Sequence, residues 1–354
     1  MEAAEDRSES LRMIRDSAAG IAPRTGDLKR VRALRFADPG FDRNVWRQMC
    51  EMGWTGLLVA EDAGGSGLGM AELCALCEEL GAGLVPEPLV AVAMAARLLP
   101  AGHLTPVLSG ERVVIPAWQE RANTYGLDGQ STALRDGRLH GRKMFVPLAA
   151  GADAFLVTTQ AGLALVARDA PGLTVDIERT QDGGNIGTLT LDGAAGEAVP
   201  GDAADPLDEA ALASAAYMLG VMDRAFAMTL DYLKTRQQFG KLIGSFQALQ
   251  HRAADLTIQL ALTRASVESA AATLDQTTVP ALRRGAVSRA KARASEAGMI
   301  VTRQCIQLHG GIGYTDEYDV GLFLRKAMVL CNLYGSAALH RARFAAVSPE
   351  QDDE

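Results

Sequence analysis

Residues 236–241 of this chain read Arg-Gln-Gln-Phe-Gly-Lys, and residues 307–314 read Gln-Leu-His-Gly-Gly-Ile-Gly-Tyr. Both stretches interrupt a C-terminal half that is otherwise rich in alanine and leucine at helical spacing. An arginine beside an aromatic residue suits a phosphate and a flat ring, and consecutive glycines let the backbone approach a ligand closely. The two stretches therefore predict a binding site for a long, phosphate-bearing cofactor on a helical scaffold.

The helical pattern continues between these stretches. One apolar stripe consists of Leu249, Ala253, Leu256, Leu260, Val267, Ala271 and Leu274. Thr277-Thr278-Val279-Pro280 then ends one helix and begins the next, because proline is tolerated in the first helical turn. We expect four long helices joined by short connections, an antiparallel four-helix bundle over residues 201–347, followed by an acidic tail over residues 348–354.

The middle of the chain has a different periodicity. Between residues 112 and 200, short apolar runs alternate with Gly, Asp and Pro, which is typical of a small antiparallel β-sandwich or barrel. Residues 1–111 again show helical spacing. The predicted fold is mostly helical with a small middle β domain: an N-terminal helical domain (1–111), a β-sandwich or barrel (112–200) and a C-terminal helical bundle (201–347).

The composition is that of a soluble globular protein, with 48% hydrophobic and 22% charged residues. A net charge of -8 argues against nucleic-acid binding. The sequence has no apolar run long enough to span a bilayer and no apolar signal segment near its start, so we expect a cytoplasmic location. The five cysteines predict neither a disulfide framework nor a metal site, and Cys74 and Cys77 fit one helix as small buried residues.

The two glycine-bearing stretches, in this order and at this separation, resemble the flavin-binding signature of the acyl-CoA dehydrogenase family. The likeness extends over nearly the whole chain. Residues 52–57 and 78–81 resemble the family's first domain, and residues 108–111 and 141–143 resemble its middle domain. The order of helices, sheet and bundle found from periodicity matches the architecture that this resemblance implies.

The resemblance implies an FAD cofactor laid across a subunit boundary. In that family the sheet domain and bundle of one subunit hold the isoalloxazine ring, and the neighbouring bundle holds the adenosine diphosphate half. By position, the residues that would face the diphosphate and adenine are Arg236, Gln238, Phe239, Ile243, Gln247, Gln307, Gly310 and Gly311. Taken singly, Arg236 reads as a helix-end cation and Phe239 as a core residue, but the whole constellation favours the cofactor.

The resemblance also implies a catalytic base, which takes the α-proton of an acyl-CoA thioester. Most members carry a Glu shortly after the glycine turn, where this chain has Tyr334, and a phenol with a pKa of about 10 is a poor substitute. A minority carry the Glu on the first bundle helix, at a position that falls on Ala210, and many of these have an Arg where Ala211 follows. Glu209 becomes a candidate base if the alignment shifts by one residue; its alternative role is an acid in the first helical turn.

The middle domain departs from the family pattern as well. Members that hold the flavin ring usually read Thr-Glu-Pro, then Gly-Ser-Asp, then Trp-Ile-Thr. Here residues 119–121 read Gln-Glu-Arg, residues 122–129 contain no Gly-Ser-Asp, and residues 145–147 read Phe-Val-Pro. Pro147 offers neither a hydroxyl nor an N–H to a flavin. The chain therefore keeps residues for the adenosine half of FAD and lacks those for the ring half.

We therefore expect a subunit of a heteromeric, α2β2 acyl-CoA dehydrogenase, similar to those of bacterial sterol side-chain breakdown. It would contribute the adenosine diphosphate half of a shared FAD site, and a homologous partner subunit would supply the catalytic Glu. A steroid side-chain acyl-CoA as substrate and an electron-transfer flavoprotein as acceptor follow from the resemblance alone. The alternatives are a self-sufficient homo-oligomeric dehydrogenase with a base such as Glu209, and a non-catalytic scaffold of the same fold.

Overall fold

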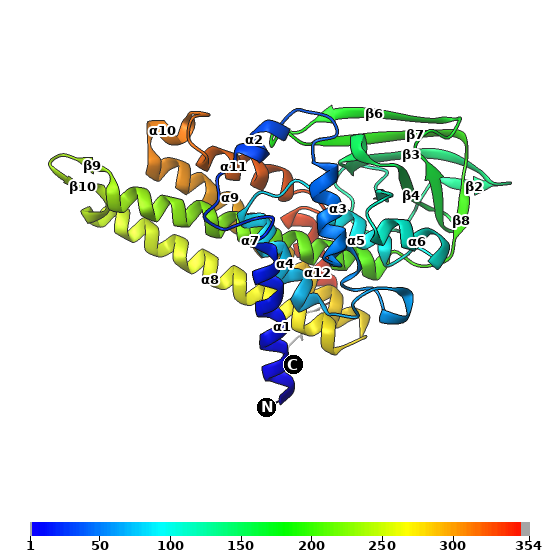
Figure 1. Cartoon of the computed structure of the whole chain (residues 1–354), viewed down its shortest axis with the longest axis horizontal. Coiled ribbons are helices and arrows are strands. Elements are labelled where there is room, and N and C mark those ends of the chain that lie inside the picture. Colours follow the sequence, from blue (N-terminus) through cyan, green and yellow to red (C-terminus); the bar gives the residue numbers. More distant parts are fainter. Residues whose placement is uncertain (1, 348–354) are drawn as a thin grey trace, which may run out of the picture. The chain divides into compact units, whose positions relative to one another are not determined.

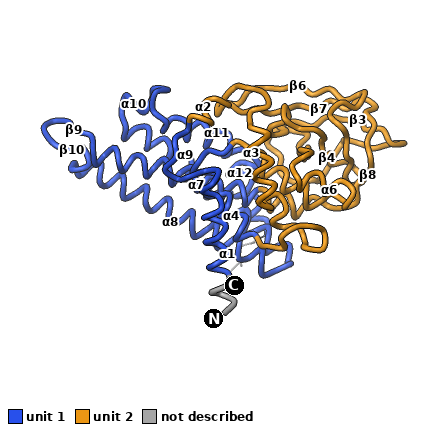
Figure 2. Tube along the Cα trace, in the orientation of Figure 1, with its two compact units in different colours: residues 1–28, 70–85, 211–354 blue, residues 29–69, 86–210 orange. Residues whose placement is uncertain are grey.

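The computed structural model describes residues 2–347, with side chains from residue 7 onward. The predicted acidic tail at 348–354 lies outside the described residues. The chain divides into two compact units, one formed by the described residues of 1–28, 70–85 and 211–354 and the other by 29–69 and 86–210 (Figure 2). Residues 1–111 thus contribute to both units. The change from helix to strand falls near residue 112 and the return to helix near residue 201, and the division into three domains stays a prediction.

The first unit is helical (Figure 1). Its elements are α1 (Glu2–Ala18), α4 (Met70–Ala82), most of α7 (Ala204–Thr235), α8 (Gln247–Gln276), α9 (Pro280–His309), α10 (Gly311–Tyr314), α11 (Val320–Leu330) and α12 (Ala337–Val347). Proline 280 begins α9 as the sequence indicated. The predicted fourth long helix is instead broken into α11 and α12. Tyr334 and Gly335, between them, have φ angles of 56° and 97°, which a continuous right-handed helix excludes.

The backbones of α4 and α7 nearly touch where they cross. A Cβ atom on Gly220 would lie 1.8 Å from the carbonyl oxygen of Glu78, and one on Gly81 would lie 2.0 Å from the carbonyl oxygen of Tyr217. The phenol of Tyr217 donates a hydrogen bond to the carbonyl of Val85 at 2.9 Å. Glycine is therefore required at both crossing positions, and any side chain there would separate the two helices.

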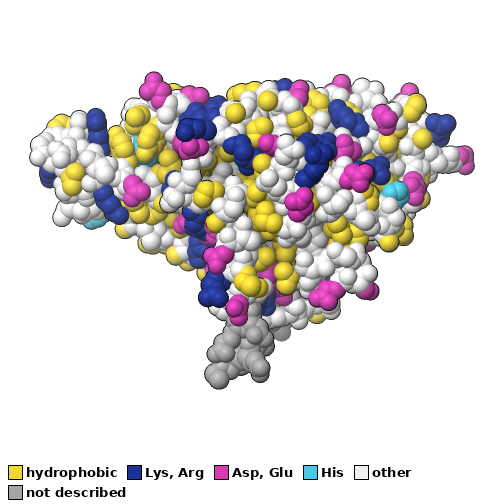
Figure 3. All heavy atoms as spheres, viewed as in Figure 1, with side chains coloured by type: hydrophobic (Ala, Val, Ile, Leu, Met, Phe, Trp, Pro, Cys, Tyr) yellow, Lys and Arg dark blue, Asp and Glu magenta, His cyan; other side chains and the backbone are white. Residues whose placement is uncertain are grey.

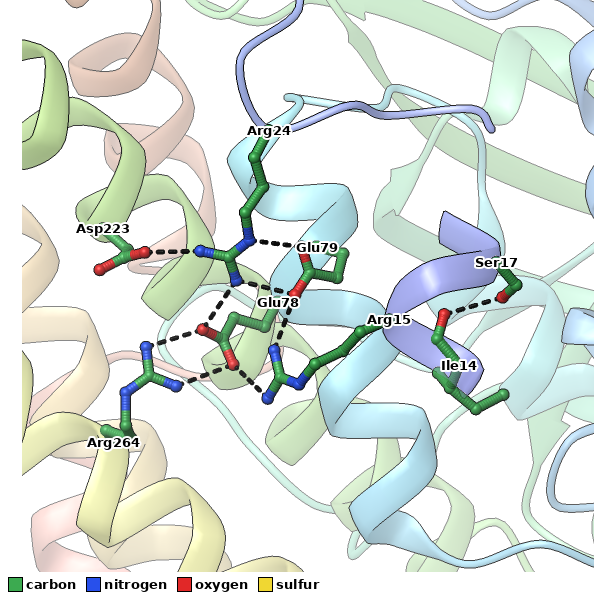
Figure 4. Close-up of polar contacts among 8 residues, drawn as sticks. All are labelled: Ile14, Arg15, Ser17, Arg24, Glu78, Glu79, Asp223 and Arg264. Carbon is green, nitrogen blue, oxygen red and sulfur yellow. Dashed lines mark hydrogen bonds and ion pairs between the residues drawn. The ribbon is translucent and has the colours of Figure 1, made fainter. Parts of the chain in front are cut away.

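A buried carboxylate on α4 ties this crossing to two further helices (Figure 4). Glu78 accepts two hydrogen bonds from the guanidinium of Arg264 on α8, at 2.7 and 3.0 Å, and one from Arg15 on α1 at 3.0 Å. Burial alone would raise the pKa of Glu78, but its hydrogen bonds and charge interactions with Arg264 and Arg15 hold that pKa below its ordinary value. The carboxylate is therefore ionised and acts as the common partner of α1 and α8.

The neighbouring carboxylate extends the cluster to α7. Arg24 bonds both oxygens of Glu79, at 2.5 and 2.8 Å, and its third nitrogen lies 2.8 Å from Asp223 on α7. Arg24 also reaches Glu78 at 3.3 Å. Three carboxylates and three guanidinium groups thus neutralise one another inside the helical unit, as the dashed lines in Figure 4 show.

The second unit holds two four-stranded sheets and several short helices. The strands are β1 (Val114–Ala117), β2 (Ala133–Arg135), β3 (Arg138–Pro147), β4 (Ala154–Thr159), β5 (Gly162–Ala167), β6 (Leu173–Arg179), β7 (Asn185–Ala195) and β8 (Glu197–Val199). The helices are α2 (Lys29–Leu34), α3 (Arg43–Glu51), α5 (Leu89–Ala96) and α6 (Ala101–Leu108), with 3-10 turns η1 (Trp54–Gly56), η2 (Glu61–Ala63) and η3 (Ala149–Gly151).

The strand orders are β1-β4-β5-β8 and β2-β3-β7-β6. The small β domain predicted from the sequence is confirmed, with one difference. All pairs in these two sheets are antiparallel except β1 and β4, which pair in parallel from Val114 opposite Ala154. The parallel pairing is possible because the chain between β1 and β4 forms β2 and β3 in the other sheet. This connection is long enough for the chain to start β4 at the same end of the sheet as β1.

Two further sequence expectations concern cysteines and membrane segments. All five cysteines are free, and Cys74 and Cys77 are both buried in α4, as predicted. None of the helices among residues 2–347 combines the length and apolar character that crossing a membrane requires.

We expect Glu78→Gln to lower the free energy of unfolding by about 2 kcal/mol, because it removes the carboxylate shared by three guanidinium groups. The loss should be smaller than for a fully buried pair, since these arginines are 35–41% exposed and solvent screens them. Glu9→Gln is the matched control. It breaks an exposed pair with Arg12 and should cost less than about 0.5 kcal/mol in urea unfolding. Equal losses in the two variants would contradict this role.

The same variant has an expected pH signature. Because the pKa of Glu78 is lower in the folded state than its ordinary 4.5, its contribution is complete above that pH and is lost as the pH falls. Glu78→Gln should therefore lose less stability than the unaltered protein when the pH drops below 4.5. Parallel stability curves for the two proteins in that range would show that Glu78 is not the titrating group.

Candidate cofactor-binding site

A tight hairpin follows the end of α7. Its two short strands are β9 (Gln237–Gln238) and β10 (Lys241–Leu242). The two turn residues, Phe239 and Gly240, have φ angles of 51° and 77°. Positive φ at both positions is the geometry of a type I′ hairpin turn, which the glycine favours and the phenylalanine adopts at some cost. The N–H of Ile243 donates to the carbonyl of Arg236 at 2.8 Å and closes the hairpin at its base.

The hairpin presents its side chains to solvent. Phe239 is 91% exposed, so its interpretation as a core residue is wrong. Arg236 and Gln238 are also exposed, Ile243 in the turn η4 (Ile243–Ser245) is half-buried, and Gln247 is exposed at the start of α8. Within the described residues, the side chain of Arg236 forms no ion pair. A guanidinium without a carboxylate partner, beside an exposed aromatic ring, is available to an anion.

Further basic side chains are exposed in and beside the hairpin. Lys234 and Lys241 lie within five residues of Arg236 in the sequence, and Arg252 is exposed early in α8; dark blue Lys and Arg side chains mark this end at the left of Figure 3. The ammonium of Lys241 lies 4.3 Å from the centre of the Phe246 ring, which packs edge-on against Phe239 at 6.2 Å. These contacts hold the hairpin while leaving Phe239 exposed.

The second stretch forms a bare glycine turn at the end of α9. Gly310 ends the helix with φ 66° and ψ −143°, and Gly311 begins α10. Both are exposed, and a Cβ atom on either would meet nothing within 4 Å. Gln307, one turn earlier, is exposed as well. The glycines thus leave the backbone open to close approach from outside, which is what a diphosphate needs.

An aromatic cluster joins the two stretches. The ring of Tyr232 stacks on the ring of His309 with 4.5 Å between centroids and 27° between planes. Tyr232 precedes Arg236 by one helical turn, and its carbonyl accepts the N–H of Arg236 at 2.9 Å. His309 directly precedes Gly310, and Tyr318 covers it at 4.9 Å. The residues predicted to face the adenosine half therefore gather at one end of the helical unit, where Figure 1 labels β9, β10 and α10.

Sequence reasoning did not single out Tyr232, His309 or Tyr318. Two signals were available. His309 lies inside the quoted glycine stretch, and Tyr232 lies in the last turn of α7, four residues before Arg236. Their contact joins segments far apart in the chain, which periodicity alone does not predict.

Tyr334, at the family's usual base position, is a core residue. It is 4% exposed, and burial raises the pKa of its phenol above the ordinary value. The imidazole Nε2 of His340 donates to the carbonyl of Tyr334 at 2.8 Å and fixes the turn between α11 and α12. A buried phenol with a raised pKa stays neutral at pH 7 and has no capacity to take an α-proton.

Glu209, the candidate from a shifted alignment, is also engaged. It is 6% exposed in α7, and its carboxylate oxygens lie 3.1 and 3.5 Å from Nε and Nη2 of Arg97. Since α7 begins at Ala204, Glu209 belongs to the second turn rather than the first. Ala210 and Ala211 beside it are buried. The carboxylate of Glu209 is therefore engaged by Arg97 and does not stand free as a candidate base.

The middle-domain positions hold a closed polar cluster instead of open donors. The ammonium of Lys143 on β3 is fully buried and donates to Glu120 at 2.8 Å and to Thr158 at 2.9 Å. Burial lowers the pKa of Lys143 to about 8, and the charge of Glu120 limits that fall. Pro147 ends β3 opposite Ile186. The Lys143 and Glu120 pair is satisfied within the unit, and Pro147 has no N–H to offer.

Known proteins similar to this chain include acyl-CoA dehydrogenases. The family models for the N-terminal and C-terminal domains of acyl-CoA dehydrogenase match residues 8–102 and 202–348. Acyl-CoA dehydrogenase IpdE2 of Mycolicibacterium smegmatis is 31% identical over 340 residues, covering 94% of each chain.

Two solved structures match almost end to end. A variant of the Tcur3481-Tcur3483 steroid ACAD has a TM-score of 0.86 at 31% identity and covers 98% of both chains. The ChsE4-ChsE5 complex from Mycobacterium tuberculosis has a TM-score of 0.85 at 28% identity, over 99% of this chain and 98% of that chain.

Members of the matched family are FAD-dependent oxidoreductases. The exposed arginine, exposed aromatic ring and open glycine turn described above fit the adenosine diphosphate half of that cofactor. The matched domains, the shared fold and the near-complete overlap with IpdE2 make this chain a member of the acyl-CoA dehydrogenase family.

Proposed function

We propose that this chain is one subunit of a heteromeric acyl-CoA dehydrogenase and binds the adenosine diphosphate half of an FAD shared with a homologous partner subunit. The partner supplies the catalytic Glu and most of the contacts to the flavin ring. One contrast carries the proposal. Arg236 and the Gly310–Gly311 turn stand exposed at one end of the helical unit, whereas the family's base position holds the buried Tyr334.

The relatives support a two-chain assembly. Both similar solved structures carry names of two proteins, and one of them is called a steroid ACAD. Their 28–31% identity to this chain over nearly its full length makes the analogy a reasonable guide to partner and substrate class. We therefore propose a partner of the same family, a steroid-derived acyl-CoA as substrate and an electron-transfer flavoprotein as electron acceptor.

When bound, FAD would supply the acceptor for the hydride that leaves the β-carbon of the thioester. The residues of this chain act on the other half of the cofactor. The Arg236 guanidinium would pair with the diphosphate. Phe239 would offer its exposed ring to the adenine. The backbone at Gly310 and Gly311 would approach the phosphates, because no side chain intervenes. These contacts bind and orient the cofactor and leave proton abstraction to the partner.

Self-sufficient catalysis is the less favoured alternative. It requires a free carboxylate near the acyl thioester, and Glu209 is held by Arg97 instead. A scaffold without cofactor is also less favoured, because it gives no reason for an exposed phenylalanine in a positive-φ turn or for an unpaired Arg236.

Purification from the native host tests whether the chain works with a partner subunit. A tagged form of this chain, isolated from its native host, should bring down a second acyl-CoA dehydrogenase chain with a Glu at the base position. The complex should be yellow, with fewer FAD molecules than subunits, and the chain purified alone should be colourless. Visible absorption and mass spectrometry measure these quantities. A single-chain preparation with one FAD per subunit and full dehydrogenase activity would refute the proposal.

Arg236→Ala should weaken FAD binding by the assembly about 10- to 100-fold, the usual loss for a hydrogen bond to a charged group. Arg236→Lys should fall between, because an ammonium has no bidentate fork. Arg284→Ala is the matched control. Arg284 is exposed near the opposite end of α9, and its removal should leave FAD affinity unchanged. Fluorescence titration of the flavin-free assembly measures all three, and an unchanged affinity in Arg236→Ala would remove this residue from the site.

Two substitutions test whether this chain supplies the base. Tyr334→Phe and Glu209→Gln should each leave kcat of the flavin-loaded assembly within about twofold, because neither group takes the proton in this account. Glu209→Gln should lower the melting temperature, since it leaves the Arg97 guanidinium without its buried partner. Loss of turnover in Glu209→Gln with FAD fully bound would favour the self-sufficient alternative.

A further inference from the structure

The hairpin at 236–241 and the Gly310–Gly311 turn, the two proposed cofactor segments, have few side chains that could fix their positions relative to each other. The hairpin tip at Phe239 and Gly240 projects into solvent, and Gly310 and Gly311 have no side chains. Closest to both segments lies the stack of Tyr232 on His309, one turn before Arg236 and one residue before Gly310. Stacked aromatic rings have a preferred geometry, so such a stack fixes the orientation of the two side chains as well as burying their surfaces.

The protonation state of His309 follows from its hydrogen bond. Its Nδ1 lies 2.8 Å from the carbonyl oxygen of Cys305, and a carbonyl only accepts, so Nδ1 carries the hydrogen. Nε2 has no hydrogen-bond partner among the described residues and is buried. Burial lowers the pKa of His309, with the bond to Cys305 acting in the opposite direction. The ring is therefore neutral at pH 7, with Nε2 as an unprotonated acceptor.

The glycine turn packs against the base of the His309 side chain. A Cβ atom on Gly313 would lie 2.8 Å from the Cβ of His309 and 2.8 Å from the carbonyl oxygen of Ile306, so the turn folds back onto the end of α9 without room for a side chain. The N–H of Gly313 donates to the carbonyl of Gly310 at 3.0 Å, which closes the turn. The turn is therefore packed against the same residue whose ring stacks on Tyr232 near the end of α7.

We propose that His309 is a positioning residue, which sets the separation between Arg236 and the Gly310–Gly311 turn through its stack on Tyr232. This inference rests on the proposed function, because the separation matters only if one ligand bridges both segments. His309 does not itself contact that ligand. It makes the two segments bind as one unit, so that the arginine and the turn reach the same diphosphate.

The neutral ring also implies an acid-sensitive site. A proton on Nε2 would place a charge in a buried position without an acceptor. The groups that face this ring are the phenols of Tyr232 from α7 and Tyr318 from the segment before α11, and Cys305 lies one turn back on α9. Around Tyr318 the charged groups are Asp231, Asp319 and Arg224. Because the folded-state pKa lies below the ordinary 6.5, the stack is fully formed above that pH and is lost as the pH falls.

A double-mutant cycle on FAD binding tests the proposal. The flavin-free assembly is titrated with FAD as the unaltered protein, Arg236→Ala, His309→Leu and the double variant. His309→Leu should weaken FAD binding about fivefold. The loss of FAD affinity caused by Arg236→Ala should be at least about threefold smaller in the His309→Leu background than in the unaltered protein, because an arginine that is already displaced contributes less to binding. Should His309→Leu not fold, Tyr232→Leu breaks the same stack from the other side.

Two controls separate positioning from general stability. Cys305→Ala removes a buried side chain of α9 but keeps the stack, so its effect should simply add to that of Arg236→Ala. His309→Phe keeps an aromatic ring without nitrogens. It should bind FAD as the unaltered protein does at pH 7.5 and lack the weakening of affinity that we expect of the unaltered protein as the pH falls below 6.5.

The outcomes are distinguishable. If Arg236→Ala alone leaves FAD affinity unchanged, the proposed cofactor role fails and this inference fails with it. If Arg236→Ala weakens binding but its effect is the same with and without His309, the cofactor role stands and the positioning role is overturned. An acid-induced loss of affinity that persists in His309→Phe would likewise overturn the positioning role, because another group would then be titrating.

Discussion

The proposed cofactor site depends on three long helices that run in alternating directions. The 32 residues of α7 run toward the hairpin, the 30 of α8 run back, and the 30 of α9 run forward again to the glycine turn. At 1.5 Å per residue these helices are nearly equal in length, so the ends of α7 and α9 meet. Arg236 and Gln307, 71 positions apart in the sequence, reach one end of the unit for this reason.

The interior of the helical unit fixes that alignment. Gly220 and Gly81 allow α4 and α7 to cross with their backbones nearly in contact. The buried Glu78 then connects this crossing to Arg264 on α8. Polar groups inside the unit therefore set the direction and register of the long helices, while apolar residues supply most of the buried area. The residues proposed to face the cofactor at the end of the unit are therefore not needed to align the helices.

Much of this was predictable from sequence because the signals were local. The boundary between α8 and α9 at Pro280, the strands between residues 112 and 200 and the two glycine-bearing segments all follow from spacing and residue type. The exposure of Phe239 also agrees with the predicted cofactor site. What failed depends on contacts distant in sequence. The parallel pairing of β1 with β4 and the ion pair that occupies Glu209 carry no local signal. The stack of Tyr232 on His309 belongs to the same group.

Departures from the family pattern are as informative as the signature itself. Of the expected base positions, one holds the buried Tyr334 and another the paired Glu209. Pro147 at the end of β3, where the family pattern has a residue for the flavin ring, has no N–H to offer. The most direct measurement is an experimental structure of the FAD-loaded native assembly. The account predicts that the diphosphate lies against Arg236 and the Gly310–Gly311 turn of this chain, with the ring and the catalytic Glu on the partner. A flavin ring and a base held entirely by this chain would contradict it.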